Sequence, residues 1–179
     1  MKDNETIQFF LNGVNPWWKN HNFKFNTKER KQYVEAITNS GSRLINILIG
    51  ARRVGKTSIL QSVINRLLKN ISPNNIIYIP AELKEVKQDG IKSIIEVITK
   101  QKKINLFKDK IHIFIDEIQE IPDWQNDIKL LYDNTKIHFY ITGSSSLLLK
   151  KETSKLTGRF ILRHVLPLSF IEFKDFYGQ

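Results

Sequence analysis

The sequence contains no cysteine, one methionine, five prolines and eight glycines among its 179 residues. Without cysteine the chain forms no disulfide and offers no thiolate to a metal or to a covalent reaction. Disulfide-stabilised proteins, proteins with Cys-ligated zinc or iron–sulfur clusters, and thiol enzymes are therefore excluded. No apolar run approaches the ~20 residues of a membrane-spanning helix, and the opening MKDNETIQFF lacks the apolar segment of a signal peptide. We therefore expect a cytoplasmic protein with no membrane partner.

Acidic residues are also in short supply. The chain has 18 Asp and Glu against 28 Lys and Arg, a net charge of +10. This charge favours an anionic partner, either a nucleotide or a nucleic acid. A lysine-rich solvated surface explains the same charge, and from composition alone we favour it over a nucleic-acid patch. The hydrophobic content of 41% is typical of a folded globular protein.

From Leu44 onward, short apolar runs alternate with helical patterns, which is typical of an α/β fold. Runs with little polar interruption predict strands that are buried on both faces of a parallel sheet. These runs cover residues 44–49, 76–79, 111–115, 137–141 and 160–166. Apolar stripes at helical spacing predict the helices between them. These stripes cover residues 59–68, 91–98 and 124–132.

The first part of the chain has a different composition, rich in Asn, Lys and aromatic residues. Its apolar spacing predicts short helices around residues 4–11 and 28–39. We therefore divide the chain into an N-terminal helical extension, residues 1–43, and a core, residues 44–179.

The first predicted strand runs into GARRVGKT, residues 50–57, and then into a helical stripe. This is the G-x-x-x-x-G-K-[ST] pattern in the strand–loop–helix context that cradles phosphates. Lys56 is expected to bridge the β- and γ-phosphates, and the Thr57 hydroxyl is expected to bind Mg²⁺. The expected nucleotide-binding residues are Gly50, Ala51, Arg52, Arg53, Val54, Gly55, Lys56, Thr57 and Ser58. The alternative, a glycine-containing turn with a surface lysine, is disfavoured by the complete pattern.

The strand at residues 111–115 ends in Asp116 and Glu117. Ligands bind outside the carboxyl ends of the strands in open α/β sheets, so we expect both acids beside the phosphate loop. Asp116 is expected to hold Mg²⁺ together with Thr57, and Glu117 to orient and deprotonate the attacking water. A kinase or GTPase has no need of this glutamate, so the pair favours ATP hydrolysis over those reactions. A solvated acidic turn is the alternative.

Residues next to two other predicted strands are further candidates for contact with the γ-phosphate. If the strand at residues 137–141 lies between the other two, a hydroxyl at its end senses the γ-phosphate; Ser144 is our first choice and Thr142 the second. Alternatively these residues cap a helix starting near Ser146, and both roles are compatible. Arg159 is expected to reach the γ-phosphate of a neighbouring subunit as an arginine finger, or else to be a surface or sheet-edge arginine.

Two segments are rich in basic residues. One contains Lys100, Lys102, Lys103, Lys108 and Lys110, and the other contains Lys150, Lys151, Lys155 and Arg163. Neither shows interleaved aromatic residues or a recognisable nucleic-acid-binding module, so we favour solvated surfaces over contacts with a phosphate backbone. The four histidines lack metal-ligand spacing, which favours positions in the core or at strand edges.

Six segments together suggest a family. They are NPWW at residues 15–18, GARRVGKTS, IFIDEIQEIPDW, ITGSSS, LTGRF and LPLSFIEF. Over nearly its whole length the chain resembles the archaeal and bacterial AAA-type ATPases of the group "AAA domain, family 14". The resemblance implies a three-layer P-loop NTPase fold of the additional-strand catalytic glutamate class, with a parallel five-stranded sheet in the order 5-1-4-3-2.

The resemblance also implies site roles that match those expected from the residues for Lys56, Thr57, Asp116 and Glu117. It places Ser144 at the sensor-1 position, where related ATPases often carry asparagine, and Arg159 near their arginine finger. Relatives usually continue beyond LPLSFIEF into a helical lid and further domains. We therefore expect residues 44–179 to be an ATPase core without these parts, and hydrolysis by it to be weak.

Taken together, the sequence predicts an AAA-type ATPase that hydrolyses ATP with Mg²⁺ to drive a conformational change. Its expected cofactors are ATP and Mg²⁺, and a homo-oligomer is a plausible assembly. Two alternatives remain open: a nucleotide-gated regulatory switch with slow hydrolysis, and a nucleic-acid-associated ATPase.

Overall fold

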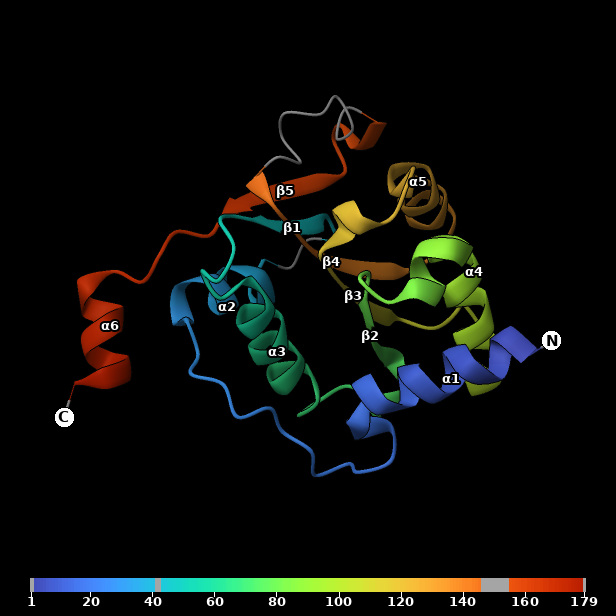
Figure 1. Cartoon of the computed structure of the whole chain (residues 1–179), viewed down its shortest axis with the longest axis horizontal. Coiled ribbons are helices and arrows are strands. Elements are labelled where there is room, and N and C mark those ends of the chain that lie inside the picture. Colours follow the sequence, from blue (N-terminus) through green and yellow to red (C-terminus); the bar gives the residue numbers. More distant parts are fainter. Residues whose placement is uncertain (1, 41–42, 146–154, 179) are drawn as a thin grey trace.

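The computed structural model describes residues 2–40, 43–145 and 155–178, with side chains described from Ile7 onward. A five-stranded parallel sheet forms its centre (Figure 1), in the order β2-β3-β4-β1-β5. The strands are β1 (Ile45–Ile49), β2 (Ile76–Pro80), β3 (Ile111–Asp116), β4 (Ile137–Gly143) and β5 (Phe160–His164). The predicted order 5-1-4-3-2 is the same order read from the other edge, and it is confirmed.

Helices cover both faces of the sheet, which gives three layers (Figure 1). The α-helices of the described residues are α1 (Lys2–Val14), α2 (Lys31–Thr38), α3 (Lys56–Leu67), α4 (Lys84–Lys102), α5 (Trp124–Asn134) and α6 (Phe170–Tyr177), of which α6 lies away from the sheet (Figure 1). From β1 the chain crosses the sheet to β2 and then returns strand by strand through β3 to β4. Because parallel crossovers are right-handed, this reversal places α3 on one face and α4 and α5 on the other.

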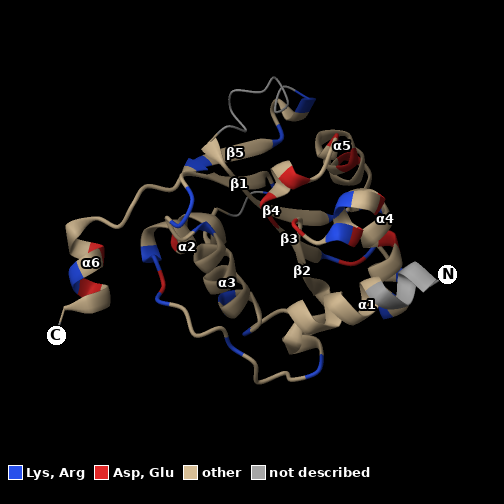
Figure 2. Cartoon of the chain, viewed as in Figure 1, with Lys and Arg blue, Asp and Glu red and all other residues tan. Residues whose placement is uncertain are grey.

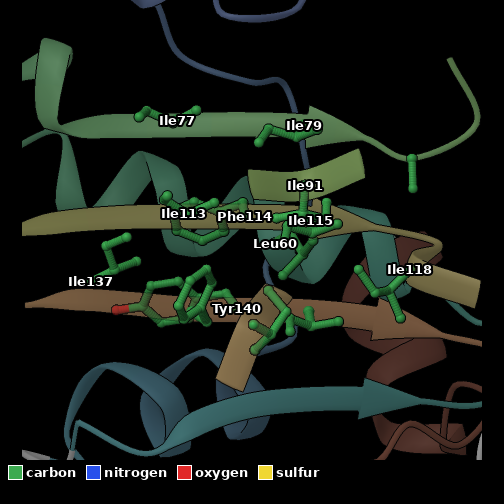
Figure 3. Packing of buried hydrophobic residues seen from close by; sticks show 14 of the residues in the cluster. Leu60, Ile77, Ile79, Ile91, Ile113, Phe114, Ile115, Ile118, Ile137 and Tyr140 are labelled. Atoms are coloured by element: carbon green, nitrogen blue, oxygen red, sulfur yellow. The ribbon is translucent and has the colours of Figure 1, made fainter. Parts of the chain in front are cut away.

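The core is built from the strands and the apolar stripes of these helices. Every residue of β1 and β3 is buried, as expected for strands covered on both faces. Figure 3 shows residues of β2, β3 and β4 in rows, together with Leu60 of α3 and Ile91 of α4. Strand β5, at the edge of the sheet, is only partly buried and ends at His164, before the predicted boundary.

The chain segment before α2 covers the edge of the sheet at β2. The turn η1 (Pro16–Trp18) follows α1, and the indole Nε1 groups of Trp17 and Trp18 both donate to the Ile76 carbonyl at 3.0 Å. Asn15 donates to the Tyr78 carbonyl at 2.9 Å and accepts from the Tyr78 N–H at 2.7 Å. These bonds satisfy the outward-facing backbone groups that an edge strand otherwise leaves open.

The helix predicted to start near Ser146 lies outside the described residues, as do Lys150 and Lys151. In the parts of the chain that the structure does describe, no helix is both long and apolar enough to cross a membrane.

Candidate functional site

The parallel sheet brings three of the predicted segments together at the carboxyl ends of its strands. The phosphate loop follows β1, Asp116 and Glu117 lie at the end of β3, and Thr142 lies near the end of β4. Strand β4 lies between β1 and β3, which is the arrangement on which the predicted roles of Thr142 and Ser144 depend. The carboxyl ends of these strands therefore form a single polar group of residues, at the place where open α/β sheets bind ligands.

The phosphate loop closes around the Lys56 side chain. The buried ammonium donates to the carbonyls of Gly50 and Ala51, each at 3.1 Å. A Cβ on Gly50 would lie 2.4 Å from the Val165 carbonyl, and Gly55 has a left-handed φ of 93°. Both positions therefore require glycine, and this explains the glycine spacing of the motif in terms of backbone geometry.

Glu117 lies opposite this lysine. The distance from Lys56 Nζ to Glu117 Oε1 is 3.5 Å, and Gln119 Nε2 donates to Glu117 Oε2 at 2.6 Å. Glu117 is itself in the left-handed region, with φ 57°, a conformation that is strained for a residue other than glycine. A strained backbone and two side-chain partners thus hold the carboxylate next to the phosphate loop.

Asp116, 7% exposed, is held by hydroxyl groups from three elements. Its Oδ2 accepts from Thr57 Oγ1 at 2.7 Å and from the Tyr78 hydroxyl at 2.9 Å, and its Oδ1 accepts from Thr142 Oγ1. Burial and the neighbouring Asp116 carboxylate raise the pKa of Tyr78 far above its usual value. The phenol therefore stays protonated and remains a donor.

Thr142 contacts both acids, because it also accepts from the Glu117 N–H at 2.9 Å. The Ser144 N–H instead donates to Gln119 Oε1 at 3.2 Å. Gln119 thus connects the end of β4 with Glu117 through its two amide atoms. Thr142, our second choice from the sequence, is the hydroxyl in contact with the acids; a γ-phosphate-sensing role for Ser144 stays a prediction.

Arg159 lies away from this group of residues within its own chain. It directly precedes β5, and Phe160 is paired with Ile45 at the beginning of β1, so it lies at the opposite end of the sheet from the phosphate loop. Its guanidinium forms a two-bond ion pair with Asp133, with distances of 2.7 and 3.1 Å. Contact with a neighbouring subunit stays a prediction.

A cleft of about 400 Å³ adjoins the phosphate loop. Its walls come from the segment before α2, the loop itself, the start of α3 and the C-terminal segment. The lining residues are Asn26, Thr27, Lys28, Arg30, Arg53, Val54, Gly55, Ser58, Gln61, Leu168, Phe176 and Tyr177. The Lys28 ammonium lies 4.6 Å from the centroid of the Tyr177 ring, so aromatic and cationic groups meet in this cleft.

Arg30 fastens one side of the cleft. It is 3% exposed and donates to the carbonyls of Val54 at 3.0 Å and Leu166 at 2.8 Å. Its remaining donors hold the Glu172 carboxylate at 2.8 and 2.9 Å, and these bonds lower the pKa of Glu172 to about 2. The phosphate loop is therefore connected to α6 through one buried arginine.

Tyr78, Gln119 and Arg30 were not among the site residues predicted from the sequence. The signal for Tyr78 was a single hydroxyl in an otherwise apolar strand, and for Arg30 a cation within an apolar helical stripe. Neither signal identifies a partner, because the Arg30–Glu172 contact spans 142 residues of sequence.

The predicted basic segments are dispersed among other groups. Figure 2 shows both acidic and basic residues on α4. Lys102 at the end of α4 lies 4.1 Å from the centroid of the Trp18 ring, and Lys155 donates to Asn126 at 3.1 Å. Binding of nucleic acid by these segments stays a prediction.

The chain is similar in sequence to a known family and to proteins of archaea and bacteria. A family model described as "AAA domain" matches residues 42–174. The uncharacterized protein MJ1637 of Methanocaldococcus jannaschii is 31% identical over 147 residues, which cover 80% of this chain and 30% of that protein. An uncharacterized protein of Haemophilus influenzae is 31% identical over 152 residues, covering 80% of this chain and 36% of its own length. The chain thus spans about a third of these relatives.

Solved structures share the fold. The Saccharomyces cerevisiae Hsp104–ADP complex superposes with a TM-score of 0.63 at 18% identity, covering 90% of this chain and 25% of that one. The Aeropyrum pernix ORC1 protein in complex with DNA gives a TM-score of 0.52 at 15% identity, with coverages of 82% and 46%. At such identities the similarity establishes the fold alone.

Proposed function

Because the chain belongs to the AAA domain family, we propose that it binds ATP with Mg²⁺ and hydrolyses it to drive a conformational change. The observation that carries this proposal is that the phosphate loop and the Asp116–Glu117 pair contact each other at the carboxyl ends of the strands. Lys56 lies 3.5 Å from Glu117, and Thr57 donates to Asp116 at 2.7 Å. A phosphate-binding cation, a candidate base and two oxygen ligands for a hard divalent cation are thus neighbours.

We assign the triphosphate to residues 50–58 and the nucleoside to the adjoining cleft, where Tyr177 offers an aromatic face. Lys56 would exchange its two loop carbonyls for β- and γ-phosphate oxygens. The Thr57 hydroxyl gives its hydrogen to Asp116, which leaves its lone pairs available to Mg²⁺. Bound there, Mg²⁺ would neutralise charge on the phosphate oxygens.

In this proposal Glu117 activates the attacking water. Its carboxylate contacts both Lys56 and Gln119. A γ-phosphate that binds Lys56 would take the lysine away from Glu117 Oε1, and this carboxylate oxygen could then accept a proton from water. Arg159 of another copy would stabilise the transition state. The division into an extension, residues 1–43, and an ATPase core, residues 44–179, is part of the same proposal.

Steady-state phosphate release with ATP and Mg²⁺ tests the enzymatic claim. We expect Lys56→Ala to abolish nucleotide binding and turnover together. Glu117→Gln should keep binding but lower turnover on the order of 100-fold, as for loss of a general base. Lys69→Ala, at an exposed lysine beyond the end of α3, is the matched control and should behave as wild type. Equal background release by all four proteins would refute hydrolysis.

A regulatory switch with slow hydrolysis is the second candidate. It is favoured by the two contacts that occupy the Glu117 carboxylate, since a base engaged by Lys56 and Gln119 is not free to deprotonate water. Calorimetric titration run beside the same assay separates the candidates: tight ATP binding without turnover in the wild type would establish the switch.

A further inference from the structure

The Asp116 carboxylate receives more hydrogen bonds than the two sequence motifs supply. Thr57 belongs to the phosphate loop and Thr142 to the end of β4, but the third donor, Tyr78, comes from β2 and from neither motif. The phenol oxygen lies 2.9 Å from Asp116 Oδ2, the same oxygen that accepts from Thr57. Tyr78 therefore shares its acceptor atom with the residue expected to bind Mg²⁺.

These donors determine how the carboxylate is oriented. An ionised carboxylate offers about four lone-pair sites, two on each oxygen. Thr57 and Tyr78 occupy both sites of Oδ2, and Thr142 occupies one site of Oδ1. One lone-pair direction of Oδ1 is left by these three bonds, so the carboxylate plane is fixed before any ligand arrives.

The position of Tyr78 is in turn set from outside the sheet. Asn15, which is fully buried, makes hydrogen bonds to both backbone groups of Tyr78, at 2.7 and 2.9 Å. Its side chain also donates to the Leu11 carbonyl at 2.8 Å, which anchors it to α1. Trp17 and Trp18 hold the Ile76 carbonyl two residues earlier on the same strand edge. The turn after α1 therefore fixes the edge strand that presents the phenol.

We propose that Tyr78 is a positioning residue for Asp116, and that Asn15, by fixing the backbone of Tyr78, sets how tightly the site holds the Mg²⁺ of Mg–ATP. This inference rests on the proposed function. It gives the NPWW segment a role in metal binding as well as in covering the sheet edge. Because Tyr78 donates to the Asp116 carboxylate, we expect it to contribute to the binding of the metal and not to the binding of the nucleotide itself.

The test measures ATP affinity of the full chain by calorimetry, once with saturating Mg²⁺ and once with excess EDTA. Tyr78→Phe should weaken Mg–ATP binding roughly tenfold, since it removes a hydrogen bond to a charged acceptor, and should leave the affinity in EDTA unchanged. Tyr140→Phe is the matched control, because it removes a tyrosine hydroxyl that bonds His112 in the same sheet at 2.9 Å. This control should change neither affinity.

Asn15→Ala tests the second half of the proposal. It should reduce the Mg²⁺ dependence of affinity like Tyr78→Phe, and the double variant should lose little more than either single one, because both act through one hydrogen bond. Thermal unfolding without ligand reports any general destabilisation. An Asn15→Ala variant that unfolds earlier but keeps the wild-type ratio of the two affinities would overturn the role of Asn15.

The same measurements distinguish a failure of the Tyr78 role from a failure of the proposed ATP binding. If the wild type binds ATP more tightly with Mg²⁺ than in EDTA and Tyr78→Phe shows the same ratio of affinities, the positioning role of Tyr78 is wrong while the proposed function stands. If the wild type binds no ATP in either condition, the proposed function fails, and this inference fails with it.

Discussion

His112 and His138 stack across β3 and β4, with their ring centroids 4.9 Å apart. His112 Nδ1 is 2.9 Å from the Tyr140 hydroxyl, and among the described residues its Nε2 is buried without a hydrogen-bond partner. Burial, the other ring and Lys110 lower the pKa of His112 to about 3. Burial, Lys110 and Arg43 lower the pKa of His138 to about 4. Both rings are therefore neutral in the folded chain, His112 in the core and His138 half-buried beside it, in keeping with the sequence-based expectation of core or strand-edge positions.

The lowered pKa values predict acid sensitivity. The unfolded chain binds protons on these rings near pH 6.5 and the folded chain does not, so stability is complete above pH 6.5 and falls toward pH 4. The free energy of unfolding should decrease by about 1.4 kcal/mol per pH unit for each histidine in this range. Denaturant unfolding at pH 7, 6 and 5 measures the slope, which His112→Phe should reduce by about half.

His21→Ala provides the control for this measurement, since His21 is exposed. The slope of its free energy of unfolding against pH should match that of the wild type. Equal slopes for the wild type and His112→Phe would show that His112 does not carry the acid sensitivity.

At the scale of elements, α6 depends on polar bonds. Phe170 and Ile171 are 80% and 72% exposed, so apolar burial contributes little to its position. Ser169 and Glu172 form a capping box at its start, and the same Glu172 carboxylate pairs with buried Arg30. The side-chain–backbone bonds of the cap define where α6 begins, while Arg30 determines where α6 lies relative to the phosphate loop.

Breaking this connection should loosen both of its ends. Arg30→Met removes both arginine bonds to the Glu172 carboxylate, which keeps its bond from the Ser169 N–H. It also leaves the Val54 and Leu166 carbonyls without this donor. We expect the free energy of unfolding to fall by about 3 kcal/mol, as when one partner of a buried ion pair is removed. We expect faster amide hydrogen exchange in α6 and in the phosphate loop, together with several-fold weaker ATP binding. Hydrogen exchange followed by mass spectrometry, with the calorimetry described above, measures both effects.

Arg66→Met is the matched control. Arg66 also pairs with a glutamate, Glu29, but both side chains are about 30% exposed, and exposed ion pairs contribute about 1 kcal/mol or less. Its exchange pattern at α6 should stay that of the wild type. Unchanged exchange at α6 in Arg30→Met would mean that Arg30 does not position this helix.

The elements that could be predicted from the sequence are those whose burial is periodic. Strands β1 and β3 are buried throughout and mostly apolar because both faces are covered. The stripe at residues 91–98 located α4 but not its start at Lys84, because Gly90 breaks the helical geometry with φ 75°. The edge cover formed by Asn15 left no periodic signal, since it binds the backbone of Tyr78, and backbone groups look alike at every position.

At the scale of the whole molecule, the motifs predicted which residues meet at the carboxyl ends of the strands but not their contacts with residues outside the motifs. Lys56, Thr57, Asp116 and Glu117 converge because parallel strands end together, a rule that strand order alone supplies. Arg30 and Glu172 meet through the path of the whole chain, across 142 positions of sequence. Contacts of this kind need the three-dimensional fold before they can be recognised.

The placement of Arg159 determines what assembly its predicted role requires. It lies at the amino end of β5, whereas the phosphate loop lies at the carboxyl end of the neighbouring β1. An arginine at one end of the sheet can reach the phosphates of another copy when that copy presents the opposite end of its own sheet, and a head-to-tail contact of this kind that closes forms a ring. The ion pair of Arg159 with Asp133 is of the exposed surface kind, whose contribution to stability is small, so breaking this pair to reach a phosphate would cost little.

Mixing two inactive variants tests this arrangement. Glu117→Gln keeps Arg159 but lacks the base, and Arg159→Ala keeps the base but lacks the arginine; each alone should release phosphate on the order of 100-fold more slowly than wild type. In mixed rings, some sites combine Glu117 of one copy with Arg159 of the next, so phosphate release should recover to a substantial fraction of wild type. Arg159→Ala mixed with the Glu117→Gln/Arg159→Ala double variant contains no intact arginine and should stay inactive. Recovery absent from the first mixture as well would place Arg159 outside the reaction and leave it as a sheet-edge arginine paired with Asp133.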